Sequence, residues 1–189
     1  MRKSTGILIL TVVLVVVGII NNRGVVLGTN DSVSAQSAMV STQESPRIGY
    51  MAPSFKLSNL EGNTNYEVGG KRSKPVFINF WASWCGPCKA EAPDLVKLYA
   101  KYMKQLDMYS VNVTTNDSLA DAKGFVDEFS LINPILTDAK GEVFKKYNGI
   151  AFPTNILVDR NGVVREIFVG MRPVSEMEKA IKKVIEDQQ

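Results

Sequence analysis

Two cysteines, Cys85 and Cys88, are the only thiols in the chain of 189 residues, and a glycine and a proline separate them. A pair at this spacing can close a disulfide, or it can supply half of a four-ligand zinc site. The sequence holds no second cysteine pair and no histidine to complete such a site. The spacing therefore favours thiol–disulfide exchange, with the Cys85–Cys88 disulfide as the redox group, no other cofactor and no metal.

The composition excludes several classes of function. Without histidine, the chain cannot build a Ser-His-Asp or Cys-His hydrolase site or a His-ligated metal centre. The 22 Lys and Arg residues nearly balance the 19 Asp and Glu residues, so the net charge of +3 gives no reason to expect nucleic-acid binding. With 45% hydrophobic and 22% charged residues, the composition is that of a globular protein.

The cysteines fall where a strand passes into a helix. Pro75–Trp81 is nearly continuous in apolar residues, which is typical of a strand buried on both faces, and a helix is expected to begin around the cysteines. Because the N-terminus of a helix favours negative charge, Cys85 should be the more exposed thiol, with its pKa lowered by somewhat less than about one unit. Cys88, one turn deeper, could attack a mixed disulfide held at Cys85. An inert disulfide would close only a small ring and stabilise little.

The helix that begins at the cysteines is expected to have one apolar face, whose residues recur at spacings of three and four. Pro93 lies inside this helix and should kink it. The residues expected to face the core are Leu95, Leu98, Tyr99, Tyr102, Met103 and Leu106.

From Ile48 onward the chain alternates strand and helix patterns, which predicts an α/β domain. Asn161-Gly162, between two β-rich runs, is a strong hairpin signal. Ser175 and Glu178 have the spacing of a helix-capping box. The other expected elements are a hairpin around Glu61-Gly62-Asn63, strands at 108–113, 134–136, 155–158 and 163–168, and helices at 120–129, 141–147 and 175–187.

The N-terminal region has the pattern of an export signal or a membrane anchor. Arg2 and Lys3 precede the apolar run Gly6–Ile20, which is somewhat shorter than the roughly 20 residues that span a bilayer. A polar stretch follows and is expected to be a flexible tether. The resulting division is a membrane anchor or signal at 1–27, a flexible linker at 28–47 and a globular domain at 48–189.

Two fates of the N-terminal segment remain open. A retained single-pass anchor is favoured, and cleavage after the small-residue sequence Val33-Ser34-Ala35 is the alternative. In both cases the globular domain is expected on the extracytoplasmic side, either bound to the cell membrane or secreted, because basic flanking residues stay inside.

Three segments resemble one family. Phe80–Lys89, which contains the cysteines, resembles the thioredoxin superfamily. Ala52–Leu57 with Gly62 is similar to the N-terminal hairpin of the membrane-tethered TlpA/ResA-like thiol–disulfide oxidoreductases, and Ala151–Thr154 is similar to the family's cis-proline loop. The resemblance covers residues 48–187 and implies a three-layer thioredoxin-like α/β fold, in which helices flank a central mixed sheet and an extra β-hairpin precedes it.

The resemblance also implies roles for individual residues. Cys85 would be the nucleophile and Cys88 the resolving thiol. Pro153 would be cis and face the cysteine pair, which would leave the backbone of Phe152 free to pair with an extended client. The implied client-binding residues are Trp84, Gly86, Pro87, Phe152 and Pro153.

Two positions bear on acid–base catalysis. Asn79 stands where ordinary thioredoxins have a buried Asp, and an amide cannot accept the proton of Cys88. Glu91 coincides with a glutamate beside the active site of ResA-like proteins, so the resemblance implies that it takes or gives this proton as a third catalytic residue. Alternatively, Glu91 is a solvated carboxylate in the first turns of the helix, where the helix dipole favours it.

The favoured function is that of a thiol–disulfide reductase of exported proteins. The resemblance suggests apocytochrome c, in cytochrome c maturation, as one client and a membrane electron donor of CcdA/DsbD type as the source of electrons. The Gly-Pro pair between the cysteines is typical of reducing thioredoxins. An oxidant of secreted proteins and a non-catalytic client-binding module are the alternatives. A peroxiredoxin is disfavoured, because Ser83-Trp84-Cys85 stands in place of a Thr-x-x-Cys pocket.

Overall fold

The computed structural model describes residues 41–187. The expected anchor, residues 1–27, and most of the expected linker lie outside this range. Ser41–Glu44, at the end of that linker, form strand β1, which pairs in parallel with β2, Tyr50–Met51. Regular structure therefore begins ahead of the boundary that the sequence placed at Ile48. None of the helices within 41–187 is long and apolar enough to cross a membrane.

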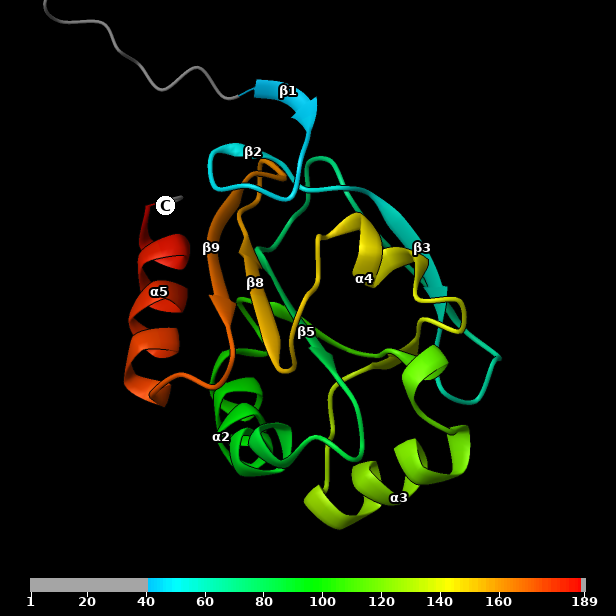
Figure 1. The fold of residues 1–189 in the computed structure, drawn as a ribbon. Coiled ribbons are helices and arrows are strands. Elements are labelled where there is room, and N and C mark those ends of the chain that lie inside the picture. Colours follow the sequence, from blue (N-terminus) through cyan, green and yellow to red (C-terminus); the bar gives the residue numbers. More distant parts are fainter. Residues whose placement is uncertain (1–40, 188–189) are drawn as a thin grey trace, which may run out of the picture. The chain divides into compact units, whose positions relative to one another are not determined.

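A mixed five-stranded sheet forms the centre of the domain, with its strands in the order β7-β6-β5-β8-β9 (Figure 1). Strands β5, β6 and β7 run parallel to one another, whereas β8 is antiparallel to β5 and β9 is antiparallel to β8. Every residue of β5 is buried, since both faces of the sheet are covered. The strands are β5 (Val76–Trp81), β6 (Asp107–Asn112), β7 (Ile135–Thr137), β8 (Thr154–Val158) and β9 (Val164–Val169).

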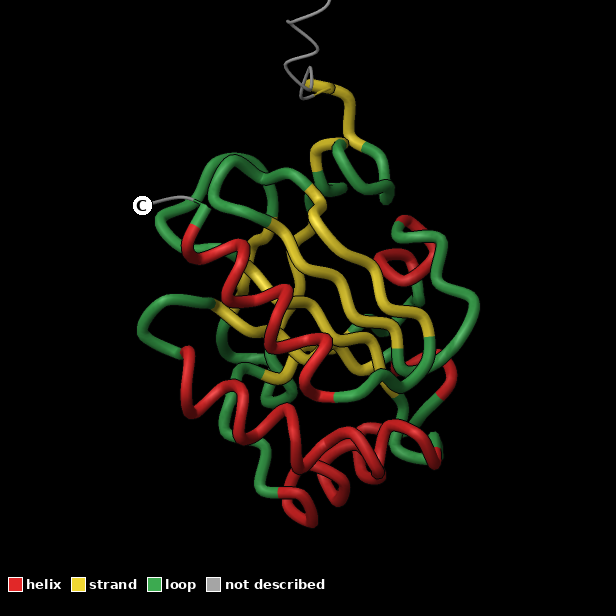
Figure 2. The backbone as a smooth tube through the Cα atoms, turned by 90° about the vertical axis from the view of Figure 1, so that its left-hand side faces the viewer, coloured by secondary structure: helices red, strands yellow, loops and turns green. Residues whose placement is uncertain are grey.

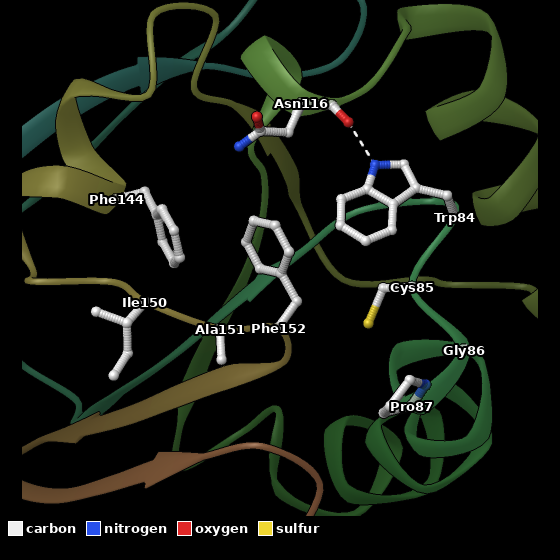
Figure 3. Close-up of a pocket in the computed structure, with 9 residues that line it drawn as sticks. All are labelled: Trp84, Cys85, Gly86, Pro87, Asn116, Phe144, Ile150, Ala151 and Phe152. Carbon is white, nitrogen blue, oxygen red and sulfur yellow. Dashed lines mark hydrogen bonds between the residues drawn. The ribbon is translucent and has the colours of Figure 1, made fainter.

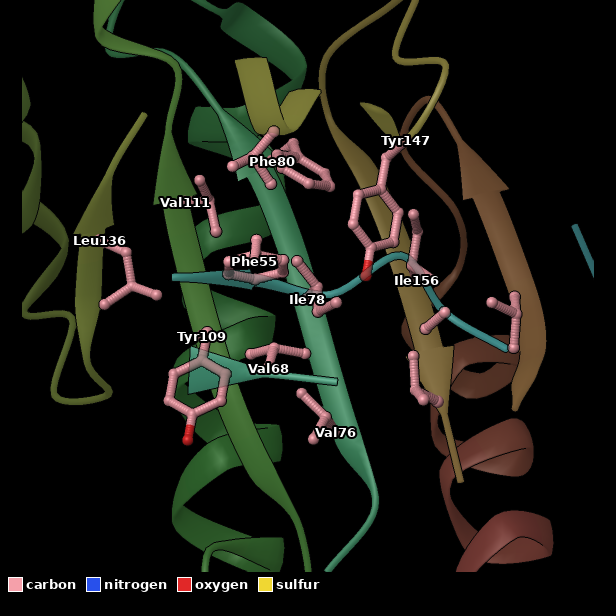
Figure 4. Close-up of a cluster of buried hydrophobic side chains, with 14 of the residues drawn as sticks. Phe55, Val68, Val76, Ile78, Phe80, Tyr109, Val111, Leu136, Tyr147 and Ile156 are labelled. Carbon is pink, nitrogen blue, oxygen red and sulfur yellow. The ribbon is translucent and has the colours of Figure 1, made fainter. Parts of the chain in front are cut away.

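One face of the sheet packs against the N-terminal hairpin and helix α4. The hairpin consists of β3 (Phe55–Ser58) and β4 (Asn65–Val68), paired antiparallel as expected, and α4 is Glu142–Lys146. Figure 4 shows the cluster of buried side chains between these layers, where Phe55 and Tyr147 lie over β5. Their rings meet edge to face, with centroids 5.9 Å apart.

The other face packs against helices α2 (Gly86–Tyr102) and α5 (Val174–Glu186). Figure 2 views the sheet from this side, with helices crossing in front of the strands. Helix α3 (Leu119–Phe129) packs next to the cysteine pair in a third cluster. The arrangement is the expected three-layer thioredoxin-like fold with an extra N-terminal hairpin.

Alternation along β5 sorts its side chains between the two faces. Ile78 and Phe80 belong to the cluster on the hairpin side, whereas Phe77 packs against α2 and α5. With a period of two, Asn79 and Trp81 point to the same side as Phe77. Asn79, a polar residue within a buried strand, thereby points toward helix α2.

Helix α2 begins at the cysteines, as expected, and continues through Pro93 to Tyr102. Met103 was expected in the core, but it is the C-cap residue and is 47% exposed. That prediction is wrong: Met103 follows the last residue of the helix, and its side chain lies largely in solvent although its backbone is still helical. Leu106, in the turn that follows, is nevertheless buried. Leu95, Leu98 and Tyr102 are confirmed in the core.

The predicted capping box of the last helix is wrong. Helix α5 begins at Val174, so Ser175 is already helical, and the N-cap residue Pro173 makes no side-chain hydrogen bond. Glu178 instead accepts hydrogen bonds from Lys101 Nζ at 2.6 Å and from Tyr102 Oη at 2.7 Å. Both partners belong to α2 and lie far from Glu178 in the sequence. Because the Glu178 carboxylate binds them, it does not cap the N-terminus of α5.

The remaining expected strands and helices are present with boundaries shifted by one or two residues. The Asn161-Gly162 turn is confirmed between β8 and β9, where Gly162 has a φ of 83° and donates its N–H to the carbonyl of Asp159. Glycine reaches this left-handed conformation without steric cost.

Candidate active site

Cys85 and Cys88 form a disulfide at the N-terminus of α2, with their Cα atoms 5.2 Å apart. Cys85 is the N-cap residue, and its sulfur accepts a hydrogen bond from the backbone N–H of Cys88 at 3.1 Å. Pro87 occupies the first turn, where its missing N–H costs no helical hydrogen bond. The sulfur of Cys85 therefore lies at the positive end of the helix, where a thiolate is stabilised.

The two cysteines do not differ in exposure as the sequence suggested. Cys85 is 4% exposed and Cys88 is 3% exposed, because both belong to a buried cluster that includes Trp81 and Phe125. They differ in what they face. Cys85 lines an open groove, whereas Cys88 and Glu91 line the same small cavity. Access from the groove, and not the exposed area of the residue, distinguishes the two sulfurs.

The groove beside Cys85 has a volume of about 340 Å³ and is built from segments far apart in the sequence (Figure 3). Trp84, Gly86 and Pro87 come from the active-site loop and the first turn of α2, and Phe152 comes from the loop before β8. Four of the five residues that the resemblance implied for client binding thus line one groove. The other lining residues are Asn116, Phe144, Ile150 and Ala151.

Pro153, the fifth of these residues, is preceded by a cis peptide bond, as expected. It is buried, it is not among the residues that line the groove, and its carbonyl accepts a hydrogen bond from the N–H of Gly170 at 2.8 Å. Of these two residues, Phe152 is therefore the one placed to contact an occupant of the groove directly.

Three aromatic rings shape the groove (Figure 3). Trp84, which is 61% exposed, meets Phe152 edge to face with ring centroids 5.8 Å apart. Phe152 in turn stacks on Phe144 of α4 at 4.7 Å. The indole N–H of Trp84 donates to the backbone carbonyl of Asn116, which fixes the outer wall. The groove thus offers a mainly apolar surface to a peptide.

Gly149 gives the Phe144 ring its space, because a Cβ atom at this position would lie 2.1 Å from Phe144 Cε2. We expect Gly149→Ala to displace the ring, to raise the KM for reduction of insulin disulfides, and to cost about 1–3 kcal/mol of stability through overpacking. Gly124→Ala in α3 is the matched control, since a methyl group there meets nothing within 4 Å. It should leave KM unchanged, and an unchanged KM in Gly149→Ala would contradict the assigned role of the Phe144 ring.

Asp117 holds the active-site loop from the opposite side. Its carboxylate accepts hydrogen bonds from the backbone N–H and from the hydroxyl of Ser83, both at 2.6 Å, and from Asn112 Nδ2 at 2.7 Å. Although burial opposes it, these hydrogen bonds and one from the N–H of Ser118 keep the pKa of Asp117 below its usual range. An ionised Asp117 therefore fixes the residue two positions before Cys85.

Glu91 is buried, with 2% of its surface exposed, so the alternative of a solvated carboxylate is wrong. Asn155 Nδ2 donates to both carboxylate oxygens, at 2.9 and 3.0 Å, and Asn79 Nδ2 lies 3.4 Å from Oε2. Burial raises the pKa of Glu91 to about 7, against the opposing effect of hydrogen bonds from Asn155 and from the backbone N–H of Arg172. At neutral pH such a group is able both to accept and to donate a proton.

Several residues of the site were not predicted from the sequence. Asn155 carried a usable signal, because a polar residue in an otherwise apolar strand requires a buried partner. Phe144, Ile150 and the pair Asn116 and Asp117 carried no local signal, since only tertiary packing brings them to the cysteines. Within residues 41–187, no group of three or more Cys, Asp or Glu side chains is placed to hold a metal ion.

Comparisons with known proteins agree with this geometry. The sequence matches the Redoxin family over residues 47–184. It is 34% identical to the thiol-disulfide oxidoreductase ResA of Bacillus cereus, over 76% of this chain and 82% of that protein. It is 37% identical to the thioredoxin-like protein YneN of Bacillus subtilis, over 70% of this chain and 78% of that protein.

Solved structures give the same result. A DsbE-like thiol:disulfide interchange protein of Chlorobium tepidum is 30% identical, with a TM-score of 0.63 over 71% of this chain and 95% of its own. StoA of Bacillus subtilis is 25% identical, with a TM-score of 0.60 over 68% of this chain and 96% of its own. The chain thus shares its fold with a solved thiol:disulfide interchange protein and with StoA.

Proposed function

Because the chain belongs to the Redoxin family and is a ResA-like thiol–disulfide oxidoreductase of the thioredoxin superfamily, we propose that it reduces disulfides in exported proteins. The observation that carries the proposal is the placement of one disulfide between two environments. Cys85 opens to a mainly apolar groove, and Cys88 faces a small cavity that it shares with Glu91. The first sulfur is suited to attack and the second to resolution.

In the first step, the Cys85 thiolate attacks one sulfur of the client disulfide. A bond forms between Cys85 Sγ and that sulfur, and the second client sulfur leaves with the electron pair and takes up a proton. The helix N-terminus and the N–H of Cys88, which donates to Cys85 Sγ in the disulfide form, stabilise the attacking thiolate.

In the second step, Cys88 loses its proton to the carboxylate of Glu91 and attacks Cys85 Sγ. The Cys85–Cys88 disulfide forms, and the first client sulfur leaves as a thiolate that is then protonated. The client disulfide has gained two electrons and two protons. The cysteine pair has lost two electrons, and its two protons were released when Cys85 ionised and when Cys88 gave its proton to Glu91. The buried position of Glu91 in the cavity that Cys88 lines supports this role.

The groove is proposed to hold the client as an extended segment. The backbone of Phe152 would pair with the segment in β fashion, and Trp84, Gly86, Pro87 and Phe152 would contact the residues beside the client cysteine. Pro153 would act through Phe152, which it directly follows.

The compartment and the partners are proposed from the N-terminal pattern and the family resemblance. Residues 1–27 would hold the domain at the outer face of the cell membrane, a CcdA/DsbD-type carrier would return electrons to the pair, and apocytochrome c would be one client. Protease added to intact cells stripped of their wall should digest the domain and leave cytoplasmic proteins whole. Protection of the domain would contradict this location.

The direction of exchange is tested by the reduction potential of the full chain, measured in glutathione buffers. A reductase is expected near the value of reducing thioredoxins, about −270 mV, whereas a value above about −150 mV would identify an oxidant. The Gly-Pro pair between the cysteines favours the reducing direction.

A further inference from the structure

Asn155 of β8 and Asn79 of β5 lie directly opposite each other in the antiparallel pair, and both are buried. Asn155 Oδ1 accepts a hydrogen bond from Asn79 Nδ2 at 2.7 Å, while Asn155 Nδ2 donates to both oxygens of Glu91. A flipped Asn155 amide would bring two NH₂ groups together and turn an oxygen toward a carboxylate. The Asn79 contact therefore fixes which end of the Asn155 amide faces Glu91.

We infer that Asn155 is a positioning residue for proton transfer at Cys88, because it orients the Glu91 carboxylate and stabilises its ionised form. The inference rests on the proposed function, since it requires Glu91 to carry the proton of Cys88. Asn155 does not itself line the cavity that Cys88 and Glu91 share, so it acts through Glu91.

A buried, ionised carboxylate needs hydrogen-bond donors, because burial removes its hydration. Two of the groups around Glu91 are ionisable, Asp94 and the reduced Cys88, and both carry negative charge when ionised. Neither can therefore compensate the carboxylate for its lost hydration. Neutral amide and backbone N–H groups provide that compensation. The groups facing Glu91 are Cys88 and Asp94 of α2, Asn79 of β5, Asn155 of β8 and the backbone N–H of Arg172, which precedes α5. Met177 of α5 contacts the amide of Asn155 through its sulfur.

The test replaces Asn155 with leucine, which has a similar volume and no donor. The pH dependence of the reaction between the reduced full chain and oxidised glutathione is measured by stopped-flow fluorescence. Loss of a hydrogen bond to a charged group should raise the pKa of Glu91 and move the acidic limb of the rate profile up by about one to two pH units. Because the pKa of Glu91 is about 7 in the unchanged protein, the rate at pH 7 should fall by about five- to fiftyfold.

A second measurement reads Glu91 without turnover. In the oxidised full chain, the ¹³C NMR titration of the Glu91 carboxyl carbon should show the same upward shift in Asn155→Leu. Should that variant fail to fold, Asn155→Ser, which puts a small polar side chain there instead of an apolar one, is expected to shift the titration in the same direction.

Ile156→Val is the matched control on the same strand. Its side chain packs into the cluster on the hairpin side of the sheet, away from Glu91, and it loses one buried methylene. It should leave the titration of Glu91 and the rate profile unchanged. A shift of equal size in this control would mean that general loosening of β8 explains the effect, and would overturn the inference.

The double variant Glu91→Gln, Asn155→Leu separates this inference from the proposed function. Asn155→Leu should add nothing to the pH profile once Glu91 cannot ionise. If Glu91→Gln alone leaves the whole pH profile unchanged, Glu91 is not the proton carrier, and the proposed role of Glu91 and the inference about Asn155 are both wrong. If Glu91→Gln changes the profile while Asn155→Leu does not move it, only the role of Asn155 is wrong.

Discussion

Cys88→Ala is expected to stop turnover and to accumulate clients that are covalently bound to Cys85. The variant keeps the sulfur that faces the groove and loses the one that would release the client, so exchange halts at the mixed disulfide. Steady-state reduction of insulin should fall by on the order of 10³-fold or more. The trapped species is measured by non-reducing electrophoresis of membranes from cells that express the full chain, followed by mass spectrometry.

Cys85→Ala is the control, because it removes the attacking sulfur and leaves Cys88 inside the protein. It should be as inactive as Cys88→Ala but should trap no client. Equal trapping by the two variants would contradict the assignment of Cys85 as the nucleophile. The identity of the trapped proteins also tests the proposed clients, since apocytochrome c is expected among them.

Glu91→Gln should alter both the activity and the pH dependence of stability. The pKa of Glu91 is raised in the folded protein to about 7 by burial, from an ordinary value of 4.5. A raised pKa means that the folded state binds this proton more tightly than the unfolded chain does. Protonated Glu91 therefore makes its full contribution to the free energy of unfolding below pH 4.5. This contribution, about 3 kcal/mol, is lost as the pH rises through 7.

Glutamine has nearly the same shape and cannot ionise, so the loss of stability between pH 5 and 8 should be much smaller in Glu91→Gln. Urea unfolding of the oxidised proteins at the two pH values measures this difference. Turnover at pH 7 should fall by about 10²-fold, the usual contribution of a general acid or base. Equal pH dependence in the two proteins would show that Glu91 titrates at its ordinary pKa, against its buried position.

The chemistry and the main elements could be predicted from the sequence because they depend on local patterns. The spacing of Cys85 and Cys88, Pro87 in the first turn, and the apolar run before them specify a thiol pair at the start of a helix. The Asn161-Gly162 hairpin was also predicted from a local turn signal. The cis Phe152–Pro153 bond, in contrast, was predicted through the family resemblance alone.

Two of the predictions that failed concern residues for which a distant partner competes with a local one. Glu178 has the spacing of a cap, but Lys101 and Tyr102 of another helix hold its carboxylate. Cys85 was expected to be exposed at its helix terminus, but residues of α3 cover the cysteine pair. A local sequence pattern cannot predict which arrangement such a residue adopts, because the more stable arrangement is the one that gains a contact from a distant part of the fold.

The sequence by itself determined that one thiol pair would sit at the N-terminus of a helix in an α/β domain, since spacing, turn chemistry and apolar periodicity are encoded locally. Tertiary structure alone decided that Glu91 is buried and that Asn155 donates to both of its oxygens. It also decided that Phe144 and Phe152 share a groove with Cys85. These features depend on the register of β5 with β8 and on the packing of helices over the sheet, which bring together residues far apart in the chain.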